Sequence, residues 1–299
     1  MKKLLIASVA LSNLVWAAQP LINADQLAEL TDVRVLDIRI IDQYLEGHIP
    51  GAVSTPYGDG WRTTMNGMSG MMPHIPVLEQ KIQNLGVNND DWVVVASSGA
   101  NAMDYAAAAR VYWTFKMLGH DQVSLLDGGM AAWQAQGLPM DAALVRAEVG
   151  DFTAQLQPQY LMTAEQIMQQ GDSLQLIDSR PQALFDGDDK FANARVAGTI
   201  PGAKNLNHTA AYQNDGVMLF ADAAQLRTLA TEAGIDLNAN ATATFCNTGH
   251  LGATQWFVFS ELLGLPNVSM YDGSIVDWTA DPERPVQTRR RGLGRLFGG

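Results

Sequence analysis

Cysteine is almost absent from this chain, since Cys246 is the only one in 299 residues. A single cysteine excludes an internal disulfide, so the thiol is either buried and inert or reactive. The count alone does not separate these two interpretations, and the surroundings of Cys246 have to decide between them.

Positive charge is also scarce. The chain has 19 lysines and arginines against 31 aspartates and glutamates, which gives a formal net charge of -12. This balance argues against nucleic acid as a partner, because phosphate binding needs a clustered cationic face. No segment after the N-terminus is long and apolar enough to span a bilayer, so no stable membrane span is expected.

The spacings typical of metal sites are missing as well. The five histidines show neither HxH nor HxxxH spacing, and we expect His48 and His120 to make structural hydrogen bonds. The segment Asp186–Lys190, DGDDK, has no glycine or distal glutamate at the offsets that a calcium loop needs. The segment Met65–His74, MNGMSGMMPH, holds soft ligands for Cu(I), or else fills a core before a helix. We predict no metal site.

The first 18 residues, MKKLLIASVALSNLVWAA, predict a cleavable secretory signal peptide. Two lysines precede an apolar centre at residues 4–15, and small residues at 17 and 18 suit a cleavage site. A retained N-terminal anchor is the alternative. The short centre and the KK start favour export to a bacterial periplasm.

The chain repeats itself once, with four matched segments in the same order. The pairs are Leu21–Leu30 with Leu161–Gln170, Val33–Arg39 with Leu174–Arg180, Gly47–Ala52 with Gly198–Ala203, and Val123–Trp133 with Val268–Trp278. Four matches in register indicate a tandem duplication of one domain. Trp133 and Trp278 occupy matched positions, which favours a core role for both.

Both halves predict the same alternation of short strands and helices. The expected strands are residues 33–39, 92–96, 174–180 and 241–245, and the main helices are 77–85, 102–118, 222–233 and 253–263. Asn23 and Thr163 are expected helix N-caps. The pattern predicts an α/β fold of two tandem domains, each a mostly parallel sheet with helices on both faces. The functional site of such a fold lies at the carboxyl ends of the strands.

The predicted organisation has five parts. They are a signal peptide (1–18), an N-terminal domain (19–139), a linker (140–160), a C-terminal domain (161–283) and a basic, disordered tail (284–299). The linker lacks a strong hydrophobic period, and the tail ends in RRRGLGRLFGG. A contact of the tail with an acidic partner or with lipid headgroups is the alternative.

Cys246 lies where a strand is expected to end and a helix to begin near Gly252, in the stretch ATFCNTGHLGATQW. Gly249 supplies the backbone freedom that a tight loop needs. In such a loop, backbone N–H groups and the helix N-terminus can point inward and stabilise a thiolate. The sequence therefore favours a nucleophilic Cys246 that is activated without a neighbouring base.

The duplicated pattern resembles the tandem-domain rhodaneses, which are thiosulfate and 3-mercaptopyruvate sulfurtransferases. The resemblance rests on LDxR, GxIPGA, a C-x-x-G loop before a helix and a closing DGxxxW, and covers about Leu21 to Trp278. It implies two rhodanese-like domains in an exported bacterial member, with a non-catalytic N-terminal copy. The corresponding strand end of that copy, VVVASSGAN, has no cysteine.

By this resemblance Cys246 carries the sulfur of a rhodanese-type sulfurtransferase. It would take a sulfane sulfur from a small donor, become a persulfide, and pass the sulfur to cyanide or another thiol, with a protein acceptor also possible. No metal or organic cofactor is implied. The active-site loop that would hold the persulfide comprises Asn247, Thr248, Gly249, His250 and Leu251.

The chain departs from the family pattern in its positive charges. The family often places a basic residue or a Gly-Ser pair after the cysteine, where this chain has Asn247 and Thr248, and a second cation at the position of Leu184. The donor is therefore left open between thiosulfate, 3-mercaptopyruvate and similar compounds.

Three side chains are candidates to replace the missing cations, namely His250, Arg180 and Arg195. Arg180 could equally form a structural pair with Asp178. We therefore predict either a substrate-binding or a structural role for Asp178, Arg180 and Arg195. The alternative function is a sulfur-binding, redox or interaction module that keeps this fold with little turnover. A Cys-x5-Arg phosphatase is not expected, because Gly252 stands where its arginine would be.

Overall fold

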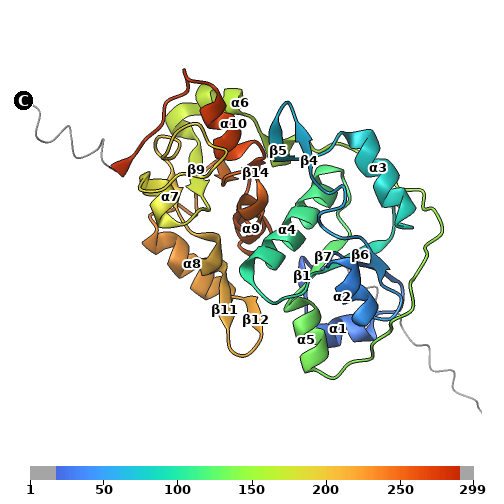
Figure 1. Cartoon of the computed structure of the whole chain (residues 1–299). Helices are drawn as coiled ribbons and strands as arrows, with labels where there is room; N and C mark the ends of the chain where they lie inside the picture. The colour runs from blue at the N-terminus through green and yellow to red at the C-terminus, as the bar shows by residue number, and fades with distance from the viewer. Residues whose placement is uncertain (1–17, 290–299) are drawn as a thin grey trace, which may run out of the picture.

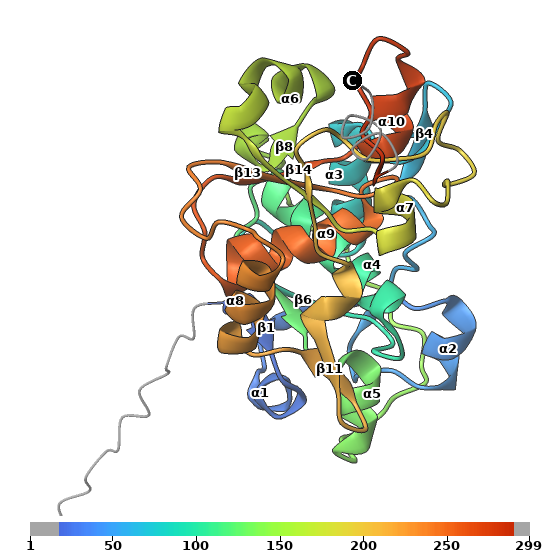
Figure 2. The same ribbon diagram turned by 90° about the vertical axis from the view of Figure 1, so that its left-hand side faces the viewer.

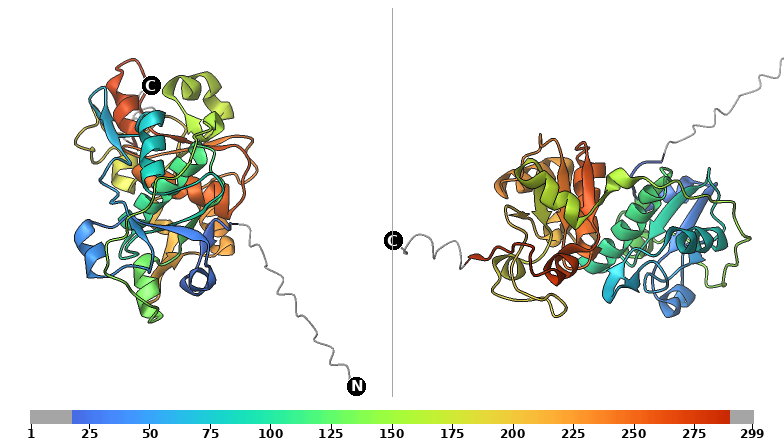
Figure 3. Two further views of the ribbon diagram at one scale, coloured as in Figure 1. Left: turned by 90° about the vertical axis from the view of Figure 1, so that its right-hand side faces the viewer. Right: turned by 90° about the horizontal axis from the view of Figure 1, so that it is seen from above.

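The computed structural model describes residues 18–289, which form two domains of the same topology (Figure 1). Each domain is built on a five-stranded parallel sheet, with strand order β1-β7-β6-β2-β3 in the first and β10-β9-β13-β14-β8 in the second. Seen from above, the two domains lie side by side, the first in blue and green and the second in yellow to red (Figure 3).

The N-terminal domain has the following elements. They are β1 (Leu21–Ile22), α1 (Ala24–Glu29), β2 (Val33–Asp37), α2 (Ile41–Glu46), β3 (Val53–Ser54), β4 (Thr63–Met65), β5 (Met68–Met71), α3 (Ile75–Asn84), β6 (Trp92–Ala96), α4 (Ala102–Met117), β7 (Val123–Leu126) and α5 (Gly129–Ala135).

The C-terminal domain repeats this order. Its elements are η1 (Pro158–Tyr160), β8 (Leu161–Met162), α6 (Ala164–Gln170), η2 (Gly171–Ser173), β9 (Gln175–Asp178), α7 (Gln182–Asp186), β10 (Lys204–Asn205), η3 (His208–Ala211), β11 (Tyr212–Asn214), β12 (Met218–Phe220), α8 (Ala223–Glu232), β13 (Thr242–Phe245), α9 (His250–Phe257), a π-helical turn η4 (Val258–Leu262), β14 (Val268–Tyr271) and α10 (Ser274–Ala280).

Helices cover both faces of the sheets, as predicted. In β6, Val93 and Val95 pack into a core with residues of α3 and α4, whereas Val94 and Ala96 pack into another core with residues of α1 and α5. Successive strand residues point to opposite faces, so an apolar run such as WVVVA is expected only where both faces are buried. Trp133 and Trp278 are buried, which confirms their predicted core role.

Local signals explain where several helices begin. Asn23, Thr163 and Asp222 each accept a hydrogen bond from the backbone N–H three residues on, and the glutamine there bonds back to the cap. These capping boxes satisfy N–H groups that a helix start leaves unpaired. The predictions for Asn23 and Thr163 are confirmed.

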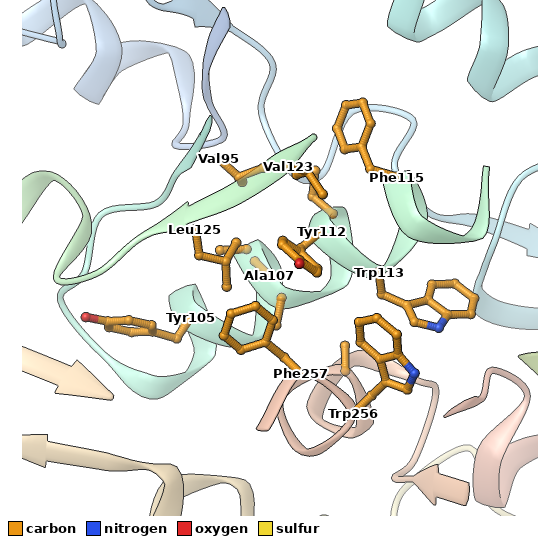
Figure 4. Packing of buried hydrophobic residues seen from close by; sticks show 14 of the residues in the cluster. Val95, Tyr105, Ala107, Tyr112, Trp113, Phe115, Val123, Leu125, Trp256 and Phe257 are labelled. Carbon is orange, nitrogen blue, oxygen red and sulfur yellow. The ribbon is translucent and has the colours of Figure 1, made fainter. Parts of the chain in front are cut away.

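The largest apolar core continues from one domain into the other through α4 and α9 (Figure 4). Tyr112 of α4 packs edge-on against Phe257 of α9, with ring centroids 4.9 Å apart, and Trp113 and Trp256 are fully buried nearby. A shared core of aromatic side chains holds two domains together more firmly than a polar contact would. The N-terminal domain is therefore positioned to contribute to a site at the start of α9.

Each domain also extends a two-stranded hairpin to the other domain. The N–H of Met72, next to β5, donates to Asp272 Oδ2 at 2.8 Å, and the N–H of Phe220 in β12 donates to Asp127 Oδ1 at 3.1 Å. Asp127 and Asp272 are matched positions of the repeat. Figure 2 shows β11 reaching down beside α5. Each hairpin thus covers the strand ends of the neighbouring domain.

The segment Met65–His74 holds the end of β4, the turn and β5 of the β4–β5 hairpin instead of a simple lead-in to a helix, because Asn66 and Gly67 turn the chain with positive φ. His48 is fully buried and its Nδ1 lies 2.9 Å from the Tyr44 carbonyl oxygen, as its predicted structural role requires. No helix within residues 18–289 is long and apolar enough to cross a membrane.

Both predicted terminal segments lie mostly outside the described residues. Of the signal peptide only residue 18 is described, and of the tail residues 284–289. In that part of the tail, Gln287 pairs with Thr199, while the indole of Trp278 donates to the Pro285 carbonyl at 2.8 Å. In the predicted linker, Asp141 pairs with His48, and Phe152 is buried in the larger core.

Candidate active site

Cys246 follows β13 directly and begins the loop that leads into α9. Gly249 caps the helix at φ +70°, and a Cβ there would lie 2.5 Å from Arg110 Nη1 and 2.7 Å from Asp272 Oδ1. Only glycine combines this backbone conformation with such close neighbours. The helix consequently begins at His250, earlier than the predicted start at Ala253.

Ser274 organises the loop from the neighbouring strand end. Its Oγ accepts the N–H of Cys246 at 3.1 Å and that of Gly249 at 3.0 Å, while its own hydroxyl donates to the Tyr271 carbonyl at 2.8 Å. The carbonyl of Cys246 accepts the Ile275 N–H at 3.1 Å. These bonds curl the chain around Cys246.

The remaining N–H groups of the loop are free for a ligand. Within residues 18–289, the backbone N–H groups of Asn247, Thr248, His250 and Leu251 have no hydrogen-bond acceptor. They flank Cys246 at the start of α9, where the helix dipole is positive. The loop therefore has the donors that an anionic sulfur needs, although Ser274 already binds the N–H groups of Cys246 and Gly249.

The thiol itself is buried. Cys246 is 1% exposed and packs with Leu251 of the same loop and with Ala106, which lies on α4 of the N-terminal domain. Side chains of both domains therefore enclose the thiol. Burial excludes bulk water and strengthens electrostatic contacts around the sulfur.

Arg62 brings a positive charge from the N-terminal domain to the loop. Its Nη2 donates to the Thr248 carbonyl at 2.7 Å and to the Thr248 Oγ1 at 2.8 Å, and its Nε donates to the Gly70 carbonyl at 2.9 Å. The hairpin that carries Gly70 therefore holds the guanidinium in place. This cation occupies the neighbourhood in which the loop sequence has only Asn247 and Thr248.

Arg110 supports the same loop from beneath. It is fully buried on α4, donates from Nη1 to the Gly249 carbonyl at 3.0 Å, and pairs with Asp272 through Nη2 at 2.6 Å. Its guanidinium also stacks over Trp113, 4.7 Å from the ring centroid. A buried ion pair that also bonds the backbone fixes the loop rather than merely attracting ligands.

His250 and Tyr57 form a contact between the domains beside the loop. The Tyr57 hydroxyl lies 2.8 Å from His250 Nδ1. Burial, together with the charges of Arg62 and Arg110, lowers the pKa of His250 to about 3, and burial raises the pKa of Tyr57. Both groups are therefore neutral at physiological pH, so His250 does not supply the positive charge that the loop lacks.

A cavity of about 500 Å³ lies beside this contact. It is bounded by the segments that follow β2, β3 and β6, by the start of α4, and by His250 of the other domain; Arg39, Arg62 and Tyr57 contribute polar atoms to its wall. Its volume suits a small organic molecule. Cys246 does not line this cavity, which adjoins the cysteine loop only at His250.

Arg180 and Arg195, which were predicted as substrate-binding or structural, are bonded within the C-terminal domain. Arg180 is buried against Asp178, with Nη2 2.6 Å from Oδ2 and 2.8 Å from the Gly198 carbonyl. Arg195 Nε donates to the Thr279 carbonyl at 2.7 Å. Neither guanidinium bonds the cysteine loop, and these contacts favour the structural alternative for both.

The N-terminal domain repeats the first of these pairs. Arg39 Nη2 lies 2.6 Å from Asp37 Oδ2 and 2.7 Å from the Gly47 carbonyl. The same pair in a domain without a cysteine indicates that LDxR and IDSR tie a strand to the following loop.

The sequence prediction missed five residues at this site. They are Tyr57, Arg62, Arg110, Asp272 and Ser274. For Ser274 a signal existed, because the repeat aligns it with Gly129. Arg62 and Arg110 carried no local signal, since their partners lie far along the chain in the other domain.

Comparisons with known proteins agree with this architecture. A family model described as a Rhodanese-like domain matches residues 22–136 and 163–281. The chain is 31% identical over 253 residues to a 3-mercaptopyruvate sulfurtransferase of Rattus norvegicus, covering 83% of each. It is 33% identical over 285 residues to a probable 3-mercaptopyruvate sulfurtransferase of Pseudomonas aeruginosa, covering 90% of this chain and 98% of the relative.

Solved structures share the fold. SseA from Escherichia coli, described as a 3-mercaptopyruvate sulfotransferase, has a TM-score of 0.74 and 25% identity over 86% of this chain and 99% of its own. An anaerobic ergothioneine biosynthesis enzyme from Chlorobium limicola has a TM-score of 0.76 at 22% identity, covering 90% and 70%.

Proposed function

The chain belongs to the rhodanese family, and we propose that it is a sulfurtransferase that carries a sulfane sulfur on Cys246. The observation that carries this assignment is the loop itself. A buried cysteine lies at a strand end, beside backbone N–H groups that have no acceptor, in a loop whose Thr248 binds a cation from the other domain.

The reaction has two balanced steps. With thiosulfate as donor, the Cys246 thiolate bonds to the outer sulfur, the S–S bond of the donor breaks, and sulfite leaves with the electron pair. The persulfide anion that remains is stabilised by the free N–H groups of the loop. A cyanide ion or a thiolate then bonds to the outer sulfur, and the Cys246 thiolate is restored.

The donor in this proposal is a small anion. Arg62 supports an anionic donor because it places a guanidinium on Thr248 and at the wall of the cavity. Thiosulfate and 3-mercaptopyruvate both carry negative charge and are small enough for the cavity that adjoins the loop at His250. The acceptor is cyanide, a small thiol or a cysteine of another protein.

We also propose that the protein is exported to a periplasm. The support is the sequence of residues 1–18, with its two lysines, its short apolar centre and its small residues before the predicted cleavage site. N-terminal sequencing of protein recovered from the periplasmic fraction tests this. A chain that starts after residue 18 supports export, and an intact N-terminus in the cytoplasmic fraction contradicts it.

The proposed activity is tested by turnover. The purified protein is incubated with thiosulfate or 3-mercaptopyruvate and with cyanide, and thiocyanate is measured. Thiocyanate that forms with the wild type but not with Cys246→Ser supports the proposal. If no donor yields thiocyanate or any other transferred sulfur, the fold serves as a binding module instead.

A further inference from the structure

His208 occupies a position from which it can reach the donor of Cys246. It follows β10, and its N–H donates to the Ser179 carbonyl at 3.0 Å; the N–H of Ser179 in turn donates to Phe245, the residue before Cys246. In the sheet, β9 lies between β10 and β13, and adjacent strands are about 4.8 Å apart. The backbones of His208 and Cys246 are therefore separated by two strand spacings, roughly 10 Å. That separation suits two groups that act on opposite ends of one small molecule.

The imidazole of His208 is buried and incompletely paired. The residue is 5% exposed, neither ring nitrogen makes a well-aligned hydrogen bond within the described residues, and the Ser179 carbonyl is the one acceptor that acts on the ring. Burial lowers the pKa of His208, and the nearby Ser179 carbonyl only partly opposes this effect, so the ring is neutral at physiological pH. Buried polar atoms are nearly always paired, and the Ser179 carbonyl can serve only one of the two ring nitrogens, so at least one nitrogen is left for a ligand.

Other unpaired polar atoms surround the same strand ends. Ser179 Oγ, Asn247 Oδ1 and Gln255 Oε1 are buried and lack hydrogen-bond partners. Ser179 follows β9, Asn247 follows Cys246, and Gln255 of α9 donates through its amide nitrogen to the Leu206 carbonyl at 3.1 Å. Unpaired polar groups therefore lie on three segments at the carboxyl ends of the C-terminal sheet.

The internal repeat shows how a side chain at this position is used. The segments GAVSTPY (51–57) and GAKNLNH (202–208) align residue by residue, so His208 corresponds to Tyr57. Tyr57 makes the equivalent backbone bond to Ile38 at 2.9 Å, and its hydroxyl reaches His250 and lines the cavity of its own domain. His208 is thus placed to line the corresponding space beside Cys246.

We propose that His208 is a catalytic residue that relays a proton when the sulfur donor is a thiol, such as a 3-mercapto-2-oxo acid. This inference rests on the proposed sulfurtransferase function. A neutral imidazole has one nitrogen that accepts a proton and one that donates, which is what a relay requires.

The relay follows from the balance of the reaction. The Cys246 thiolate forms the new S–S bond, the C–S bond of the donor breaks, and its electron pair passes to the carbon that becomes an enolate. The thiol proton must leave the sulfur and reach that carbon, which becomes a methyl group. His208 accepts this proton and returns it. Thiosulfate has no such proton, and its sulfite leaves without protonation.

The two donors therefore provide the test. Persulfide formation is timed by rapid quenching and intact mass for the wild type, His208→Gln and His208→Phe, with thiosulfate and with 3-mercaptopyruvate. We expect both variants to lose about 100-fold or more with 3-mercaptopyruvate, the usual contribution of a proton-transfer group, and to stay within a few-fold with thiosulfate. His120→Gln, which changes another buried histidine, is the control and should affect neither donor.

Other outcomes overturn the inference in distinguishable ways. An equal loss with both donors assigns His208 a packing role, and wild-type rates with both donors show that the imidazole takes no part in the reaction. If the wild type forms no persulfide with either donor, the proposed function fails first and the relay with it. Thermal melting of both variants separates a folding defect from a chemical one.

Discussion

Ser274 lies at φ +52°, the conformation that Gly129 adopts at φ +52° in the matching position of the other domain. A non-glycine residue in this left-handed region costs about 1–2 kcal/mol. The N-terminal domain has no cysteine loop to hold and keeps the glycine. In the C-terminal domain a serine adopts this strained conformation. Its Oγ accepts the N–H groups of Cys246 and Gly249, and these hydrogen bonds offset the cost.

The first prediction separates this strain from the hydrogen bonds. Ser274→Ala and Ser274→Gly both remove the acceptor, but only glycine also relieves the backbone. We expect Ser274→Gly to be more stable than Ser274→Ala by about 1 kcal/mol in urea denaturation. Both variants should form the Cys246 persulfide more slowly than the wild type. Equal stability of the two would show that the conformation carries no cost here.

The second prediction concerns Arg62 and the affinity for the donor. Replacing a charged hydrogen-bond donor costs about 1.5–3 kcal/mol, so Arg62→Gln should raise the KM for thiosulfate about 10-fold or more. The increase should shrink at high ionic strength. Arg195→Gln, which removes a guanidinium bonded to Thr279, is the matched control. An unchanged KM for thiosulfate in Arg62→Gln would show that Arg62 does not contribute to donor binding.

The third prediction concerns the buried ion pair of Arg110 and Asp272. Arg110→Met leaves the Asp272 carboxylate buried without its partner, which typically costs about 3–5 kcal/mol. Adding Asp272→Asn removes the stranded charge and keeps an acceptor for the Met72 N–H, so the double variant should be more stable than Arg110→Met alone. Chemical denaturation of the wild type, Arg110→Met, Asp272→Asn and the double variant gives the coupling energy between the two side chains. Simple additivity would contradict the pairing.

The fourth prediction is a pH dependence of stability that arises from Asp127. Burial raises the pKa of this carboxyl to about 6 from 3.8. The folded state therefore holds the proton more tightly than the unfolded state, so the contribution of Asp127 is full below pH 4 and is lost as the pH rises through 6.

Asp127→Asn mimics the protonated form and keeps an acceptor for the Phe220 N–H. Relative to the wild type, it should gain at most about 3 kcal/mol between pH 4 and pH 7. Thermal unfolding across this pH range measures the difference in stability between the two proteins. Asp215→Asn, in the exposed turn of the β11–β12 hairpin that carries Phe220, controls for the loss of one charge. A gain that does not vary with pH would contradict the assignment.

Much of the fold follows from signals that are local in the sequence. Apolar strand runs, capping residues such as Asn23 and Thr163, and the internal repeat together predict two parallel sheets covered by helices. The pair of Asp178 and Arg180 is also local, since the two residues are neighbours at a strand end. These features depend on residues close together in the chain, so a sequence pattern suffices to find them.

The completed site depends instead on how the two domains face one another. Arg62 and Arg110 bond the loop only because the shared core of α4 and α9 brings the domains together, and the hairpins that cross between them leave no periodic signal. The missing positive charge beside Cys246 was readable from the sequence, but its source in the other domain was not. Ser274 and His208 are intermediate cases. The internal repeat aligns them with Gly129 and Tyr57, and so shows that the two halves differ at these positions.

The central claim is that Cys246 carries the transferred sulfur, and the intact mass of the protein tests it most directly. The wild type and Cys246→Ser are incubated with thiosulfate, desalted, weighed, and weighed again after cyanide is added. The account predicts that the wild type gains the mass of one sulfur atom and loses it to cyanide, while Cys246→Ser gains nothing. An unchanged wild-type mass with both thiosulfate and 3-mercaptopyruvate, or the same gain in Cys246→Ser, would contradict it.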